Sequence, residues 1–278
     1  MFRSFNGLCA LLFVFFADGM TNKARATETR ENRVLILATT TSSQDSGLLD
    51  LLLPHFQEKT GYLVKTIAVG SGQALAIGRR GDADVLLVHA PDEEKMFIAN
   101  GHGVERRSFM YNYFVLAGVS EDPAGVSKTK SVPEAFRRIA DSKTLFLSRG
   151  DESGTHIMEQ RLWHRAGVRP SGRWYQQSGQ GMGPTLIIAA EKKAYVLTDR
   201  STYLRLKKRI GLKVLLDGDS ELLNIYSLIR VNSQKSSRIN VAGGKAFFDF
   251  MLSRETMKRI ETFGVEKFGE PLFGLIKQ

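Results

Sequence analysis

The chain has 278 residues, of which 42% are hydrophobic, and it carries a formal net charge of +10 and a single cysteine. This length is long for one domain and sufficient for two lobes with separate cores. One cysteine excludes a disulfide-rich scaffold, and basic doublets that are scattered without interleaved aromatic residues argue against nucleic-acid binding.

The first 26 residues have the pattern of a secretory signal peptide. Arg3 supplies a positive start, Leu8 to Ala17 are apolar, and Ala24-Arg25-Ala26 offers a cleavage site. Because the apolar stretch is too short to cross a bilayer, a membrane anchor is the weaker alternative. Cys9 lies inside this stretch, so the mature chain would contain no thiol. We therefore expect a freely diffusing protein in a bacterial periplasm.

After the leader, short β-rich runs alternate with amphipathic stretches. Pro54 lies within the first apolar helical face and is expected to kink or shorten that helix. Repeated strand-helix units predict a mostly parallel sheet with helices on both faces. In chain order, we expect strands at 34–38, 62–69 and 83–89 and helices starting near 46, 73 and 92.

Two longer apolar strands, at 110–118 and 223–231, are expected to cross between lobes. Two lobes joined by two extended segments form a hinged clamp with a ligand cleft between them. The predicted first lobe contains 33–114 and 228–278, and the second contains 115–227. In the second lobe we expect strands at 144–147 and 194–198 and helices near 131–140, 153–167 and 184–193, and two further helices at 243–263 return to the first lobe.

Four loops share one design, in which small hydrogen-bond donors precede the start of a helix. A helix start exposes unpaired N–H groups and partial positive charge, so it attracts an anion. Glycine allows close backbone approach, and Ser or Thr adds a hydroxyl donor. In open α/β sheets, such loops gather at the carboxyl ends of the strands. The loops span residues 39–43, 70–73, 148–155 and 178–183.

Each loop alone has a simpler interpretation, because Ser, Thr and Asp are also ordinary helix caps. The joint interpretation rests on four such loops in two lobes and on Arg149, whose guanidinium can hold an oxyanion with two hydrogen bonds. The alternative for Arg149 is an ion pair with Asp151 or Glu152. We expect no catalytic residues, no cofactor and no protein-bound metal ion. An Asp199–Arg200 pair is expected to be a structural ion pair.

Two other kinds of site are disfavoured by spacing. His156 and His164 can share a helix face, but no cysteine and no regularly spaced carboxylate joins them to form a metal site. A serine hydrolase would need a Gly-x-Ser-x-Gly turn, and Gly70-Ser71-Gly72 has the wrong spacing. The sequence from 178 to 183 is not a phosphate-binding P-loop, because no Gly-Lys-Ser/Thr follows the turn.

At these loops the chain resembles the substrate-binding proteins of tungstate ABC transporters. The resemblance extends over nearly all of the mature chain, and the set of motifs is highly specific. It implies a type II periplasmic-binding-protein fold, with Thr40, Ser71, Arg149 and Thr155 contacting the oxyanion. By loop position alone, Ser42, Ser153 and Gly154 would assist. The motifs are Ala38-Thr39-Thr40-Thr41-Ser42, Gly70-Ser71-Gly72-Gln73, Ser148-Arg149-Gly150-Asp151, Ser153-Gly154-Thr155-His156 and Gly179-Gln180-Gly181-Met182-Gly183.

The resemblance implies a monomeric tungstate receptor that delivers its cargo to an inner-membrane permease. Residue chemistry leaves molybdate, sulfate and phosphate open, because donor-only loops suit any fully ionised dianion. Hydrogen phosphate needs an acceptor for its proton, which Asp151 could supply. An enzyme acting on a phosphorylated compound is the alternative from another class, with His156 as its nearest base.

Overall fold

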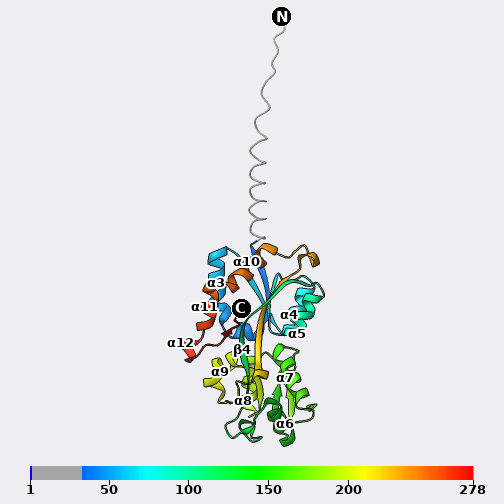
Figure 1. Cartoon of the computed structure of the whole chain (residues 1–278), viewed down its shortest axis with the longest axis vertical. Coiled ribbons are helices and arrows are strands. Elements are labelled where there is room, and N and C mark those ends of the chain that lie inside the picture. Colours follow the sequence, from blue (N-terminus) through cyan, green and yellow to red (C-terminus); the bar gives the residue numbers. More distant parts are fainter. Residues whose placement is uncertain (2–32, 278) are drawn as a thin grey trace.

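The computed structural model describes Met1 and residues 33–277 and shows two αβ lobes, one above the other in Figure 1. The predicted signal peptide lies outside the described residues. The first-lobe elements are β1 (Val34–Thr40), α2 (Thr41–Asp45), α3 (Leu48–Thr60), β2 (Leu63–Val69), α4 (Ser71–Arg79), β3 (Val85–Val88) and α5 (Pro91–Ala99), with α10 (Val241–Leu252), α11 (Arg254–Thr262), α12 (Val265–Phe268) and β10 (Gly274–Leu275) from the C-terminal part.

The second lobe is built from the middle of the chain and lies below the first in Figure 1. Two strands, β4 and β9, join the lobes. The elements are β4 (Gly103–Gly118), α6 (Val132–Ser142), β5 (Phe146–Ser148), α7 (Gly154–Arg165), β6 (Tyr175–Gln177), α8 (Met182–Glu191), β7 (Val196–Asp199), α9 (Arg200–Ile210), β8 (Lys213–Leu216) and β9 (Leu223–Val231), with short 3-10 turns at Val126–Lys128 and Ser220–Leu222. A further 3-10 turn, at Ser233–Lys235, follows β9 in the first lobe.

The first-lobe sheet is mixed, so the prediction of a mostly parallel sheet was wrong. Its strand order is β10-β4-β9-β3-β1-β2, with β1 parallel to both β2 and β3. The other three pairings, β3 with β9, β9 with β4 and β4 with β10, are antiparallel. The reason lies in the crossings: β4 leaves the first lobe and β9 returns to it, so these strands run in opposite directions.

Strand β4 is a continuous connection between the lobes. Its first part pairs with β9, and its last part, from Phe114 to Gly118, pairs with β7 and β8 of the second lobe. The prediction of two crossing strands is confirmed, and β9 has the predicted bounds. Strand β4 begins earlier than predicted because its polar start, at Val104 to Ser108, lacks the apolar run that marked the rest.

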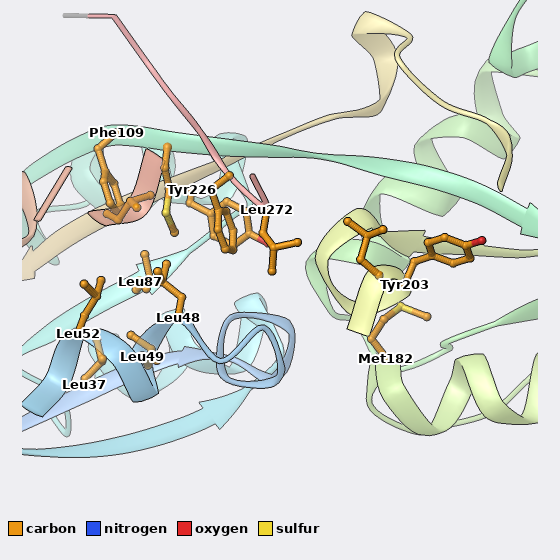
Figure 2. Packing of buried hydrophobic residues seen from close by; sticks show 14 of the residues in the cluster. Leu37, Leu48, Leu49, Leu52, Leu87, Phe109, Met182, Tyr203, Tyr226 and Leu272 are labelled. Atoms are coloured by element: carbon orange, nitrogen blue, oxygen red, sulfur yellow. The ribbon is translucent and has the colours of Figure 1, made fainter. Parts of the chain in front are cut away.

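Helices cover both faces of the first-lobe sheet, with α3 and α11 on one side and α4 and α5 on the other (Figure 1). All of β3 is buried, as a strand covered on both faces should be. Helix α3 continues to Thr60 through Pro54, so the proline does not end it, and the helix buries Leu48, Leu49, Leu52 and Phe56 against the sheet. In Figure 2, the buried residues of this lobe gather on one side and Met182 and Tyr203 lie apart, beside the second-lobe helices.

Candidate functional site

In the first lobe, parallel pairing brings the strand ends that precede α2 and α4 together. Thr40 is in register with Val69, and Thr39 is in register with Leu87. Thr40 caps α2, because its side chain accepts a hydrogen bond of 3.3 Å from Ser43 N. The short helix α2 therefore begins at Thr41, directly after the strand, and was not predicted, whereas the helix expected near Ser46 is α3, which begins at Leu48. This edge presents the helix starts of both α2 and α4.

The hydroxyl groups at this edge are buried and connected. Thr40 Oγ1 lies 3.2 Å from Ser42 Oγ and 2.8 Å from Ser43 Oγ. Ser71 is the first residue of α4, and its Oγ accepts a hydrogen bond of 3.5 Å from His89 N. Thr40, Ser42 and Ser71 are each buried, so their polar atoms are held in a water-poor environment where hydrogen bonds to a guest are strong.

The second lobe repeats this design at the parallel ends of β5 and β6, where Ser148 is in register with Gln177. Ser153 caps α7 by accepting a hydrogen bond of 3.3 Å from His156 N. Thr155 lies in the first turn of α7 and is 1% exposed. Among the described residues, its Oγ1 is buried without a hydrogen-bond partner. A buried hydroxyl in this state suits a ligand that accepts its proton.

Arg149 is 3% exposed and lies between the loops of both lobes. Its Nη2 donates to Asp151 and, at 3.3 Å, to Thr41 Oγ1 of the first lobe. Its Nε donates to Gln180 O at 3.4 Å. The ion pair with Asp151, one of the two alternatives for Arg149, is therefore present. Within the described part of the chain no hydrogen bond engages Nη1, so the ion pair leaves donor capacity on the guanidinium.

The loops of the two lobes face one another at van der Waals distance. A Cβ added to Gly70 would lie 3.3 Å from Ser153 Cα, and a Cβ added to Gly154 would lie 2.5 Å from the Cε1 atom of His89. A larger residue at position 154 would force the lobes apart, because side-chain atoms do not approach this closely. Glycine is therefore required at 154 for the closed arrangement, and Gly154 acts by allowing the approach of His89.

A cavity of about 290 Å³ lies between the lobes beside these loops. It is bounded by the crossing strands through Phe114 and Asn224, by α7 through Arg161, and by His89. Gly154 is the one predicted site residue in its wall. Of the four loops, the cavity wall therefore includes only the one at 148–155, and the cavity extends from there along α7 and the crossing strands.

His89 was missed as a site residue by the sequence reasoning, as was Tyr226 of β9, whose ring packs against that of His89 with centroids 4.9 Å apart. His89 follows β3, at the same edge as Thr40 and Ser71, and its Nε2 lies 3.3 Å from Ser42 Oγ. Burial, and then the nearby Arg149 charge, lower the pKa of His89 to about 4, so the ring is neutral near neutral pH. The sequence did contain one signal for His89, which is its position at the end of the third predicted strand. The carboxyl end of that strand lies at the same edge of the sheet as the ends of the first two strands.

The residues considered for other chemistry have structural roles. His156 Nδ1 accepts from Glu152 N at 3.1 Å, and its Nε2 lies 3.2 Å from Gln160 Nε2. No group of three or more His, Cys, Asp or Glu suited to a metal ion occurs in the described chain. Asp199 and Arg200 were expected to pair with each other, which is wrong. Asp199 caps α9, whereas Arg200 pairs with Asp217 and Glu270.

Comparison with known proteins identifies the class. The model of the PBP superfamily domain matches residues 23–255. Tungstate-binding protein TupA of Peptoclostridium acidaminophilum is 43% identical over 96% of this chain and 94% of its own. The crystal structure of the tungstate ABC transporter from Geobacter sulfurreducens has a TM-score of 0.76 at 45% identity, covering 83% of this chain and 98% of its own. Tungstate binding protein TupA from Desulfovibrio alaskensis G20 has a TM-score of 0.73 at 42% identity, covering 88% and 99%.

The two-lobed fold and the helix starts facing one another across its middle define a periplasmic-binding-protein fold, and the chain is a member of the PBP superfamily. Within that superfamily, it belongs to the family of the tungstate-binding proteins. The relatives are named as binding proteins, in agreement with the prediction of a binding protein and not an enzyme. None of the described helices is long and apolar enough to cross a membrane.

Proposed function

We propose that the chain binds tungstate in the periplasm and delivers it to the membrane permease of an ABC importer. The observation that carries this proposal is the meeting of loops from both lobes around the buried Arg149. Such a clamp matches the names of the relatives, which describe tungstate binding and an ABC transporter. The lobes are proposed to comprise 33–114 with 228–278 and 115–227, following an N-terminal signal peptide.

In this proposal, Thr40 and Ser71 from the first lobe and Arg149 and Thr155 from the second contact the oxyanion. Thr155 Oγ1 is a buried hydroxyl with no protein partner in the described chain, so it has a proton to donate. Ser42 and the backbone N–H groups that follow Ser153 and Gly154 supply further donors at helix starts. Arg149 supplies the positive charge that a desolvated dianion requires.

The donor-rich character of the site favours a fully ionised oxyanion over hydrogen phosphate. Asp151 was the acceptor that could have received the proton of hydrogen phosphate. Its Oδ2 is paired with Arg149, and its Oδ1 accepts from Ser153 N at 3.2 Å. Because both oxygens are already engaged, Asp151 supports the loop and adds little acceptor capacity for a protonated guest.

Titration of the purified protein with tungstate, molybdate, sulfate, phosphate and thiosulfate tests the proposal. Calorimetry should give tight binding of tungstate and clearly weaker binding of sulfate, phosphate and thiosulfate. Since tungstate and molybdate are nearly equal in size, competition between those two anions is measured separately. Weak, mutually competitive binding of all five anions would remove the tungstate assignment and leave a general oxyanion receptor.

A further inference from the structure

A basic groove crosses the boundary between the lobes on the side of α9 and α12. Two adjoining cavities, of about 480 Å³ and about 470 Å³, form it, and Arg205, Lys267 and Phe268 line both. Figure 1 shows α12 low in the first lobe and α9 high in the second, on the same side of the molecule. All seven predicted site residues belong to the described chain, and none of them lines the groove. The groove is therefore separate from the oxyanion site.

Both lobes contribute walls to the groove. The first lobe contributes Gly47, from the turn between α2 and α3, and residues between 259 and 268, from α11 and α12. The second lobe contributes residues between 204 and 213, from α9 to the start of β8. A Cβ added to Gly47 would lie 2.7 Å from Arg205 Nη1, so this arginine of the second lobe reaches the first. The complete groove therefore exists only while the two lobes are together.

The walls of the groove are strongly basic, with six basic residues and one acidic residue, Glu266. Arg259 pairs with Glu255, whereas the four lysines make no ion pair within the described chain. Cations in the last turn of α9 are favourable because of the helix dipole, but Lys213 and Lys267 lie outside that helix. The basic residues are Arg205, Lys207, Lys208, Lys213, Arg259 and Lys267.

Apolar side chains line the base of the groove. Leu204 and Leu212 are buried, and Phe263 and Phe268 are half-buried. Lys267 Nζ lies 5.5 Å from the centroid of the Phe268 ring. An apolar centre with a polar rim is the usual composition of a protein interface. The groove fits a segment that places acidic side chains against its rim and apolar side chains against its base.

Other occupants fit this groove less well. A bilayer surface is flat, so it does not reach apolar side chains that lie in a recess between two lobes. A second copy of this chain carries the same net charge of +10, and long-range repulsion opposes its approach. The lysines of the rim are exposed, so they would hold a small anion only through solvent-screened contacts. Charge and shape together favour an acidic protein segment.

We propose that this groove docks an acidic segment of a partner protein, whose carboxylates pair with the basic rim and whose apolar side chains cover Phe263 and Phe268. This inference rests on the proposed delivery of tungstate, and it assigns the acidic segment to the permease that receives the anion. Because each lobe supplies part of the rim, charge reversal in either lobe weakens docking.

Tungstate uptake tests the docking surface. Right-side-out membrane vesicles from the cells that make this protein are loaded with ATP and supplied with purified variants. Lys207→Glu/Lys208→Glu should raise the protein concentration needed for half-maximal uptake at least about tenfold, because like charges would then face the acidic segment. Lys267→Glu, in the first lobe, should raise it about threefold or more. Tungstate affinity, measured by calorimetry, should change less than about twofold in both variants, since exposed charges outside the site are screened.

The matched control is Lys192→Glu/Lys193→Glu. These lysines are exposed, follow α8 in the same lobe and line neither cavity. The control therefore has the same change in charge and loses the same kind of favourable contact with the end of a helix. It should leave uptake unchanged. Equal losses in the two double variants would show a general effect of charge, and no loss in Lys207→Glu/Lys208→Glu would show that the groove is not used. Either result would overturn the inference.

Two further measurements separate the possible failures. Protein-free vesicles of phosphatidylglycerol and phosphatidylethanolamine should not bind the wild-type protein in co-sedimentation. Binding that is lost in Lys207→Glu/Lys208→Glu would identify a lipid surface as the partner and overturn the inference. Wild-type protein that binds tungstate but supports no uptake would remove delivery and docking together. Normal uptake with all variants would remove the docking surface alone and leave the proposed function intact.

Discussion

The two halves of the site offer different chemistry. The first lobe contributes buried hydroxyls that are linked to one another and to helix α2, and it contributes no cation. The second lobe contributes Arg149, its counter-ion Asp151, and Thr155, whose hydroxyl has no partner in the described chain. The first lobe therefore offers neutral hydroxyl groups that are already held in place. The second lobe offers a positive charge and hydrogen-bond donors that remain available to a ligand. We infer that lobe closure, more than initial docking, provides most of the affinity.

The buried titratable groups next to the site also differ between the two lobes. In the first lobe, burial lowers the pKa of His89 to about 4, which keeps this residue neutral. In the second lobe, burial raises the pKa of Glu159 on α7 to about 7. Glu159 Oε1 accepts from Trp163 Nε1 at 3.1 Å and from the Tyr175 hydroxyl at 2.8 Å. Near neutral pH, Glu159 is therefore partly ionised, whereas His89 is neutral.

The largest effect is expected for Arg149→Ala. Removing a buried charge that faces a desolvated anion should cost ~2–5 kcal/mol of binding free energy, which is roughly thirtyfold or more in affinity. Calorimetric titration with tungstate measures it. Unchanged affinity would show that Arg149 serves only to hold its own loop through Asp151.

A matched control for this change is Arg161→Ala. Arg161 lies on α7 of the same lobe and pairs with Asp92 of the first lobe at 2.8 Å, but it is 45% exposed. As a solvent-screened pair, it should contribute no more than about 1 kcal/mol to closure. A large loss of tungstate affinity in Arg161→Ala would show that the outer contacts between the lobes, and not the loops, provide most of the affinity.

Glu159→Gln should change stability in a pH-dependent manner. The folded-state pKa of Glu159, about 7, lies above its ordinary value, so the folded protein binds the proton more tightly than the unfolded chain does. The contribution of protonated Glu159 is present below pH 4.5 and is lost as the pH rises through 7. The neutral amide should therefore stabilise the protein on the order of 2 kcal/mol at pH 8 and change it little at pH 5. Urea unfolding at both pH values measures this, and equal effects at both would contradict the raised pKa.

Local sequence patterns were sufficient to place most strands, the helix starts and the loops of the site. Apolar runs and small-residue loops depend on neighbours along the chain. Three of the seven predicted site residues, Arg149, Ser153 and Gly154, lie directly against first-lobe residues. Strand direction carries no such signal, because antiparallel and parallel neighbours can have the same apolar pattern. The mixed sheet was missed for that reason.

The supporting residues could not be predicted because their partners are distant in sequence. Ser42, His89 and Tyr226 belong to three different segments, and only pairing of β3 with both β1 and β9 brings them together. Asn112 and Asn224 likewise meet because β4 and β9 are in register there. A polar residue in an apolar strand indicates that a buried partner is needed but does not say which residue provides it.

The smallest expected effect distinguishes the hydroxyls of the two lobes. Thr155→Val removes a hydroxyl that has no partner in the described protein, so it should weaken tungstate binding by about 1 kcal/mol and leave the free energy of unfolding unchanged. Thr40→Val should lower both quantities, since Thr40 also caps α2, and loss of a cap costs about 0.5–2 kcal/mol. Calorimetry and urea unfolding of both variants provide the comparison. If Thr155→Val destabilised the free protein as much as Thr40→Val did, its hydroxyl would have a structural partner and the contrast between a preorganised first lobe and an unsatisfied second lobe would be lost.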